Sequence, residues 1–506
     1  MRRFILCCLM LALCQPKAEG FDTGHHKDMT IAALRKEGFK DDAIRVIVLQ
    51  NWIVDWYSAH GADKTILKLV RIAGSETGVG EIVQNHDDFV IAFESSYLHF
   101  DNLNKWQNAQ ANWGPSTDVR DYWKTLADST AAAIHDRFRA KDPDVLSILS
   151  LLGISLHAVQ DFYAHSNWVD GQNPADGAYD VTTWWDLENH PPLSSRVTGA
   201  FTGSYGKNAK GILHDDMNKD SYSSPQWEAA YAAAYWATIQ WIRAFKAIVD
   251  HERADFWVKC LKGARVLGKD SSVLDENLTW SYILSECNGK WKGGEANDIL
   301  NIIGSASDYR NQSSIFRAAF NQQYVYAPLS RDLGHKEIRK GLQPGLNPPQ
   351  FSPLPPDEDA IRLVIPQVKS LSAATFFDTQ MFAKIRMSAG NVAQEFVENT
   401  QFGNPGKKPS DWKVLFFVPK GTSTVQVHIA LYNEIDRSHE RDQHVRIGDE
   451  SGYDLAFEFH PSDGTCVFHG NSVACSSSSK LESQGSSGHR ANVKLYMERR
   501  SLVGPS

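Results

Sequence analysis

The most constraining feature of the chain is an apolar stretch that polar side chains interrupt at a fixed interval. Residues 143–165 read PDVLSILSLLGISLHAVQDFYAH, which contains few helix-breaking residues and predicts a buried α-helix. His157, Asp161 and His165 follow one another every four residues. At about 100° per residue this spacing drifts only about 80° around a helix, so all three side chains share one side. Such groups are costly to bury unless they pair or hold an ion, and imidazole with carboxylate suits zinc.

The same spacing has an ordinary structural interpretation. A single histidine of the three can be a hydrogen-bonded core residue, and Asp161 can pair locally. That interpretation accounts easily for one residue and poorly for three in register. The pattern therefore favours a metal centre over a set of unrelated core polar groups.

The chain changes character along its length. Residues 21–250 are predicted to be mostly helical, with helical spacing over 28–49 and 226–249 and a loop-rich segment over 166–225. Residues 251–340 predict further helices without a chemical motif. Residues 341–358 contain six prolines and mark a domain boundary, which predicts two halves that fold separately.

Beyond the prolines, apolar and polar residues alternate, as in WKVLFFV and TVQVHIAL, and predict strands over residues 359–506. The predicted fold class is a multidomain α + β chain. An all-helical domain is followed by a helical extension and by a C-terminal antiparallel β-sandwich.

The first twenty residues are typical of a secretory signal peptide. Arg2 and Arg3 precede a ten-residue apolar core, and small residues favour cleavage after Gly20. A lipoprotein anchored through Cys14 is the alternative, although bulky Leu13 stands where a small residue is preferred. We therefore expect a secreted or periplasmic protein.

Four cysteines remain once the signal peptide is removed, and an even number in an exported protein favours disulfides. They are Cys260, Cys287, Cys466 and Cys475. Short loops cost less closure entropy, which favours Cys260–Cys287 and Cys466–Cys475 among the three possible pairings. Four buried thiols are the alternative.

Further metal-competent groups lie toward the N-terminus. Cleavage would make Phe21 the first residue, and a free α-amino group with a pKa near ~8 can bind a metal. His25 and His26 follow it. Asp55 lies in NWIVDW and His99 lies in SYLHFDN, each among aromatic and aliphatic residues. Taken singly, each of these residues fits a structural role better than a metal-binding one.

Together these residues resemble the zinc-dependent phospholipase C family, which includes bacterial phosphatidylcholine-type enzymes and clostridial alpha-toxin. The specific part is HAVQDFYAHSNW over residues 157–168, similar to the HxxQDFYxHSNW subgroup shared with Het-C-like proteins. The resemblance covers residues 21–250. It implies an all-helical catalytic domain with three zinc ions, in which metal-activated water attacks phosphorus without a Ser or Cys nucleophile.

The resemblance also implies three sets of zinc ligands. They are Asp55, His99, His157 and Asp161 for the first ion, Phe21, His26 and bridging Asp161 for the second, and His165, His214 and Asp220 for the third. Asp55 and Asp161 would be the catalytic carboxylates. The third set matches least well, because His165 follows Asp161 by four residues rather than six.

Several positions of this match have rivals. Phe21 stands where the family has Trp, and His26 fits the family register better than His25 does. His190 is a rival for the third histidine. Asp215 and Asp216 are rivals for the third acid.

Residues 360–499 resemble, more weakly, calcium-dependent lipid-binding sandwiches of the C-two type. The candidate calcium ligands are Asp378, Glu434, Asp436 and Asp442. Carboxylates at loop tips suit Ca²⁺, which takes six to eight oxygen ligands. Asn433 stands where Asp would bind more strongly, and a solvated acidic loop is the alternative.

The net charge of −8 counts against a nucleic-acid partner, and no apolar run reaches the ~18 residues of a membrane span. We therefore expect a monomeric, secreted zinc phospholipase C that cleaves phosphatidylcholine-type lipids at a membrane surface into diacylglycerol and a phospho-head group, with calcium as a further candidate ion. Two alternatives stay open. One is a zinc-dependent single-strand nuclease, and the other is a non-enzymatic Het-C-like protein of toxicity or allorecognition.

Overall fold

The protein is seen in a computed structural model. It describes residues 23–39, 43–44, 47–48, 50–51, 54, 96–101, 103, 119–139, 145–172, 177–188, 200–203, 212–220, 222, 224–252, 355–370, 380–399, 407–434, 443–448, 453–483 and 491–504. The predicted signal peptide lies outside the described residues. So do the predicted extension beyond residue 252 and the proline-rich segment up to residue 354.

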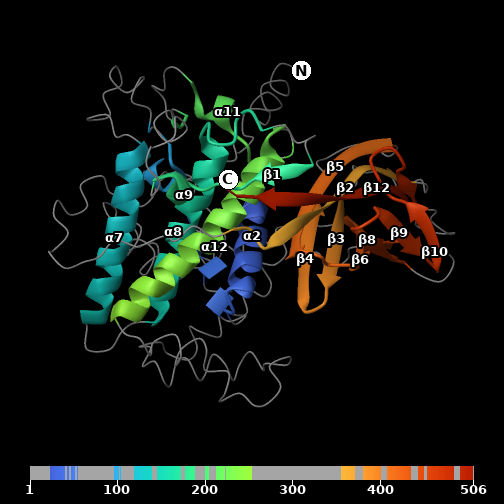
Figure 1. Ribbon diagram of the computed structural model, residues 1–506. Helices are drawn as coiled ribbons and strands as arrows, with labels where there is room; N and C mark the ends of the chain where they lie inside the picture. Colours follow the sequence, from blue (N-terminus) through green and yellow to red (C-terminus); the bar gives the residue numbers. More distant parts are fainter. Residues whose placement is uncertain are drawn as a thin grey trace, which may run out of the picture.

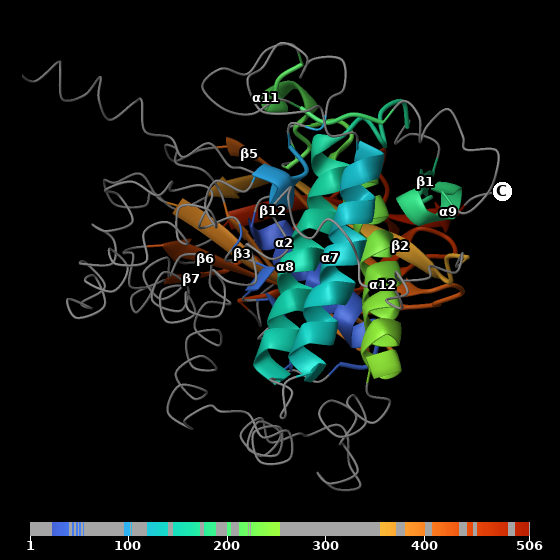
Figure 2. The same cartoon turned by 90° about the vertical axis from the view of Figure 1, so that its left-hand side faces the viewer.

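The N-terminal half is built from packed helices. They are α2 (Thr23–Lys36), η1 (Ser96–His99), α7 (Val119–Arg139), α8 (Val145–His165), α9 (Trp184–Glu188), α11 (His214–Met217) and α12 (Trp227–Glu252). The helices predicted over 143–165 and 226–249 are confirmed as α8 and α12. Figure 2 shows α7, α8 and α12 side by side with α2 behind them. Among the described residues, no helix combines the length and apolar character needed to cross a bilayer.

Helix α8 is central because its sequence is apolar on nearly every side. From Ile148 to Ser166 every residue is buried, including its polar ones. Helix α12 packs against α8 through alanines and large aromatics, and Trp227, Trp236 and Trp241 are each 1% exposed. Small residues let the helix backbones approach, and the aromatic rings fill the remaining volume.

The C-terminal half contains two sheets. Its strands are β2 (Glu358–Ser370), β3 (Gln380–Ala389), β4 (Val392–Asn399), β5 (Lys407–Pro419), β6 (Val425–Glu434), β7 (Gln443–Val445), β8 (Leu455–His460), β9 (Thr465–Phe468), β10 (Asn471–Ala474), β11 (Leu481–Glu482) and β12 (Ala491–Val503). One sheet has the order β1-β12-β2-β5 with β11 beside β12, where β1 (Ala178–Asp180) comes from the N-terminal half. The other sheet has the order β10-β9-β8-β6-β3-β4 with β7 beside β6. The predicted antiparallel strands are confirmed. A disulfide joins Cys466 to Cys475, as expected, whereas Cys260 and Cys287 lie outside the described residues.

One strand of the sandwich comes from the helical half. Strand β1 (Ala178–Asp180) pairs in parallel with β12 through Ala178 and Ser501, Tyr179 and Leu502, and Asp180 and Val503. The expectation of an all-helical N-terminal domain is therefore wrong for this segment. A three-residue strand is too short to produce a readable alternation, so the periodicity of the sequence does not reveal it.

The two halves share one apolar core. Ala360, Leu415, Phe417 and Leu502 of the sandwich belong to the same buried cluster as the helices. The ring of Phe417 is stacked on that of Tyr235 with centroids 3.7 Å apart and an interplanar angle of 3°. In Figure 1, α2 and α12 face the sheet that contains β2, β5 and β12. This shared core does not fit the expectation of two halves that fold separately, because either half alone would expose it to water.

Buried charges cross the same interface. Arg362 Nη2 donates to Glu228 Oε1 at 2.7 Å, and the Tyr179 hydroxyl donates to Glu228 Oε2 at 2.6 Å. The Tyr235 hydroxyl donates to Glu358 Oε2 at 2.8 Å. Glu228 thus has partners from both halves, and Glu358 of the sandwich has its partners in the helical half; these contacts offset the cost of removing the carboxylates from water.

Candidate metal centre

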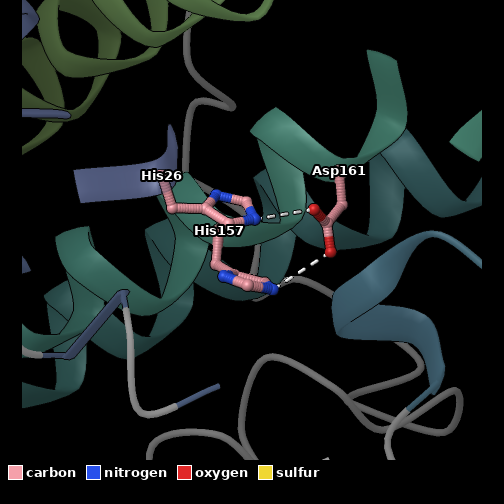
Figure 3. A group of neighbouring side chains, drawn as sticks. All are labelled: His26, His157 and Asp161. Carbon is pink, nitrogen blue, oxygen red and sulfur yellow. Dashed lines mark ion pairs between the residues drawn. The ribbon is translucent and has the colours of Figure 1, made fainter. Parts of the chain in front are cut away.

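The three polar residues of α8 point to one side of the helix, as the spacing predicts. His157, Asp161 and His165 are each 0% exposed. Their nearest polar neighbours come from α2, from η1 and from the segment around α11. Figure 3 shows Asp161 reaching toward the imidazoles of His26 and His157.

The first cluster is arranged around Asp161. Its Oδ2 lies 3.0 Å from His157 Nε2 and 2.9 Å from His99 Nδ1, and these two nitrogens are 3.1 Å apart. Its Oδ1 lies 3.0 Å from His26 Nε2. Two ligands of a tetrahedral zinc, each at about 2.0–2.1 Å from the ion, lie roughly 3.3 Å apart. The atoms of this cluster therefore have the separations that zinc ligands need, and the two oxygens of Asp161 face different histidines.

Gln160 sets the tautomer of His26. The Gln160 amide nitrogen donates to Thr30 Oγ1 at 2.8 Å and to Thr238 Oγ1 at 3.1 Å, so its oxygen is the acceptor. That oxygen lies 2.6 Å from His26 Nδ1, which must carry the proton. The lone pair of His26 is then on Nε2, the nitrogen that faces Asp161. The network joins α2, α8 and α12 behind the cluster.

The second cluster lies one helical turn further along α8. Asp101 Oδ1 is 2.9 Å from His214 Nδ1 and 3.6 Å from His165 Nδ1, and His165 Nε2 is 3.2 Å from Asp220 Oδ1. The rings of His165 and His214 meet edge to face with centroids 4.3 Å apart. All four residues are buried. The cluster contains two imidazoles and two carboxylates, a donor set that zinc prefers.

A close backbone contact brings His214 into the second cluster. A Cβ atom at Gly203 would lie 2.5 Å from His214 Cα and 2.7 Å from its backbone nitrogen. Gly203 also donates its N–H to the carbonyl of His165 at 3.3 Å. Only glycine permits this approach of the loop to the end of α8.

Burial and neighbouring charges shift the pKa values of buried histidines in opposite directions in the two clusters. Burial lowers the pKa of His157 to about 3, and the attraction of Asp161 only partly opposes this. Burial alone would also lower the pKa of His165 and His214, but the carboxylates of Asp220 and Asp101 outweigh it, so both pKa values are raised. The first cluster thus offers a neutral imidazole, whereas the second holds protons that a metal would displace.

The carboxylates of the two clusters also differ. Burial alone would raise the pKa of Asp161, but the histidines around it hold that pKa well below its ordinary value. Burial raises the pKa of Asp220, and His165 offsets the effect only in part. An ionised Asp161 is the form that binds cations.

Two buried oxygens indicate that the residues fit a metal. Neither Asp161 Oδ1 nor Asp220 Oδ2 accepts a hydrogen bond from the residues that the structure describes. A buried carboxylate oxygen without a hydrogen bond is costly unless a cation satisfies it. Groups able to hold a metal are formed by His26, His157 and Asp161 and by Asp101, His165 and His214.

The structure thus brings seven of the nine proposed ligands into two adjacent clusters. They are His26, His99, His157 and Asp161 in the first cluster and His165, His214 and Asp220 in the second. The other two, Phe21 and Asp55, lie outside the described residues, as does the rival His190.

The remaining rivals have different positions. His25 packs against the rings of Trp227 and Tyr231 rather than facing Asp161, which agrees with the choice of His26. Asp216 is exposed and accepts from the Leu213 N–H at 3.0 Å, which caps α11. For Asp215 only the backbone is described, within α11.

Sequence reasoning missed the role of Asp101. Its signal was present, because Asp101 follows His99 by two residues in the same HFD motif, but nothing in the sequence shows that it faces His214. The calcium candidates cannot be placed in this way. Asp378, Asp436 and Asp442 lie outside the described residues, and of Glu434 only the backbone, at the end of β6, is described.

No protein-family model and no curated protein matches the chain. Among solved structures, a C-two domain of plant extended synaptotagmin 1 is 11% identical and covers 28% of this chain and 95% of its own, with a TM-score of 0.19. Clostridium perfringens alpha-toxin from an avian strain is 11% identical and covers 83% of this chain and 94% of its own, with a TM-score of 0.13. At such TM-scores these likenesses carry no weight for the fold or the function of this chain.

Proposed function

We propose that the chain is a zinc-dependent phosphodiesterase that hydrolyses phospholipids in the manner of a phospholipase C. The observation that carries the proposal is the position of Asp161. One of its oxygens faces His26, the other faces His99 and His157, and the second cluster begins one turn along the same helix. A carboxylate in this position suits an ion on each side of it.

The residues of the two clusters would have different roles in such a centre. His26, His99, His157 and Asp161 would hold metal in the first cluster, and His165, His214, Asp220 and Asp101 would hold or orient it in the second. Bound zinc lowers the pKa of a bound water and neutralises charge on a phosphate oxygen. Gln160 holds His26 in the tautomer that faces the cluster. Because the surrounding residues are buried, competing water is excluded from these ligands.

The proposal also includes the class of substrate, the docking at a membrane surface and the location of the protein. The HxxQDFYxHSNW resemblance supports a phosphatidylcholine-type lipid, and the sandwich supports docking at a membrane surface. The predicted signal peptide supports a secreted or periplasmic location. A centre with three zinc ions would use the predicted ligands Phe21 and Asp55 in addition to the ligands that the structure describes.

The test is a substrate panel on the mature protein. We expect hydrolysis of phosphatidylcholine vesicles that a chelator abolishes and added zinc restores. Asp161→Asn should lower the rate by more than about 100-fold, because it removes the charge between the ions. Asp463→Asn is the matched control, since Asp463 is an exposed turn carboxylate in the sandwich and its loss should leave the rate unchanged.

Other outcomes favour the alternatives. Chelator-sensitive cleavage of single-stranded DNA without lipid hydrolysis would assign the centre to a nuclease. Full zinc occupancy without either activity would make the metals structural, as in a non-enzymatic Het-C-like protein.

A further inference from the structure

The turn from His99 to Asp101 contributes one side chain to each cluster. His99 ends helix η1 and reaches Asp161 and His157 of the first cluster at 2.9 and 3.1 Å. Asp101, only two residues later, reaches His214 of the second cluster at 2.9 Å. Two side chains so close in sequence diverge to different clusters only if the backbone between them bends sharply.

Phe100 makes that bend in a conformation that side-chain-bearing residues rarely adopt. Its φ is 53°, in the left-handed region. A non-glycine residue persists there only where its surroundings hold it. The Phe100 ring is 0% exposed and packs against Tyr122, Trp123 and Phe162 with centroids 4.7, 4.6 and 5.2 Å away. The ring thus anchors the strained backbone in the core beside α8.

A hydrogen bond closes the connection between the clusters. His165 Nδ1 lies 2.8 Å from the backbone carbonyl of His99, which can only accept, so this nitrogen carries the proton. A metal would therefore bind His165 through Nε2, the nitrogen that faces Asp220. A ligand of the first cluster therefore sets, through its own backbone, the tautomer of a ligand of the second.

We propose that the His99-Phe100-Asp101 turn couples the two clusters, so that they load metal cooperatively, with Phe100 as the positioning residue. The proposal rests on the metal centre of the proposed function. Filling the first cluster fixes His99, and the anchored turn then presents Asp101 and the oriented His165 to the second. Neighbouring cations repel one another, so positive coupling has to come from such preorganisation.

Native mass spectrometry of the metal-free mature protein at limiting zinc measures this coupling. We expect the wild type to divide into empty and fully loaded chains with few partly loaded ones. In Phe100→Gly the backbone is freed and the anchor is lost. The partly loaded population should then rise at least about fivefold, the lower end of common coupling factors. Phe245→Ala is the control for general core loss, since Phe245 is a buried aromatic of α12 and its removal should leave the distribution unchanged.

A second variant keeps the test decisive if Phe100→Gly does not fold. Asp101→Asn keeps the shape of the side chain but removes the charge facing His214. Coupling predicts that it also weakens the zinc remaining in the first cluster by at least about fivefold, measured by competition with a chromogenic chelator. Unchanged affinity there, or a wild type that loads in independent steps, overturns the coupling alone. A wild type that binds no zinc overturns the proposed function as well.

Discussion

At the scale of single residues, Asp161 carries most of the argument for a metal centre. It is a fully buried carboxylate whose two oxygens face different histidines, and one of those oxygens accepts no hydrogen bond from the described residues. A structural carboxylate looks different. Asp186 is equally buried, but it accepts hydrogen bonds from the backbone and the hydroxyl of Thr183 at the start of α9.

This contrast gives a matched pair of substitutions. Asp161→Ala should release the metals on both of its sides at once, so the zinc retained after dialysis falls by two ions per chain. Asp186→Ala should lower stability by about 1–2 kcal/mol through the lost cap without changing the zinc content. Elemental analysis of the dialysed proteins measures both. A full zinc complement in Asp161→Ala would show that this residue does not bridge.

The second cluster should bind metal in a pH-dependent manner. The pKa values of His165 and His214 are raised above 6.5, because nearby carboxylates outweigh burial. A raised pKa stabilises the metal-free fold at low pH, and this stabilisation is lost as the pH rises through the raised value. Zinc must displace these protons, so its affinity should increase with pH and binding should release protons. Calorimetry in buffers of different ionisation enthalpy detects the release, and an affinity independent of pH above 6.5 would contradict the prediction.

At the scale of elements, α8 positions both clusters and depends on one glycine. A Cβ atom at Gly153 would lie 2.3 Å from the carbonyl oxygen of Ile47 and 2.8 Å from Gln50 Cβ. The backbone of helix α8 at Gly153 therefore lies directly against the backbone of Ile47 and Asn51. The same segment supplies Asn51, which donates to Gln160 Oε1 at 3.0 Å behind the first cluster.

Gly153→Ala should therefore disturb packing and site together. We expect a loss of about 1–3 kcal/mol of unfolding free energy, as for other overpacked cores, and faster loss of zinc to a chelator. Gly171→Ala is the control, because Gly171 has nothing within 4 Å of its Cβ position and a φ of 87°, so it should cost only backbone strain. Equal zinc retention in the two variants would show that this contact does not support the cluster.

The elements differ in how far the sequence predicts them. Helices α8 and α12 follow from long apolar periodicity, and strand β6 follows from the alternation in TVQVHIAL. The ligands after α8 are harder to predict from the sequence. His214 and Asp220 reach the second cluster through tertiary contacts, such as the close approach at Gly203, and these contacts have no local signature.

Alternation is the wrong interpretation for the run from Val414 to Val418 in β5, because all five residues are buried. A continuous apolar run indicates a strand covered on both faces, and this is the sign of the shared core that the sequence does contain.

At the scale of the whole molecule, the sandwich packs directly onto the helix that carries His26. Gln394 of β4 donates to the carbonyl of Asp28 at 2.9 Å, and Lys36 pairs with Glu358 at 3.2 Å. Both contacts lie on α2. The proposed membrane-docking module is therefore also a structural support for the metal centre, and deleting it would test both roles at once.

Two adjacent residues of β5 separate these roles. Phe417 faces the helices and stacks on Tyr235, whereas Phe416 faces the interior of the sandwich. Either substitution by Ala should cost about 3–5 kcal/mol. Phe417→Ala should loosen the contact between the halves, so that amide hydrogens of α2 and α12 exchange faster while the interior strands of the sandwich stay protected. Phe416→Ala should instead expose the strands β3 and β6 first. Hydrogen exchange followed by mass spectrometry distinguishes the two patterns, and identical patterns would show that the halves unfold as one unit whichever face of β5 is altered.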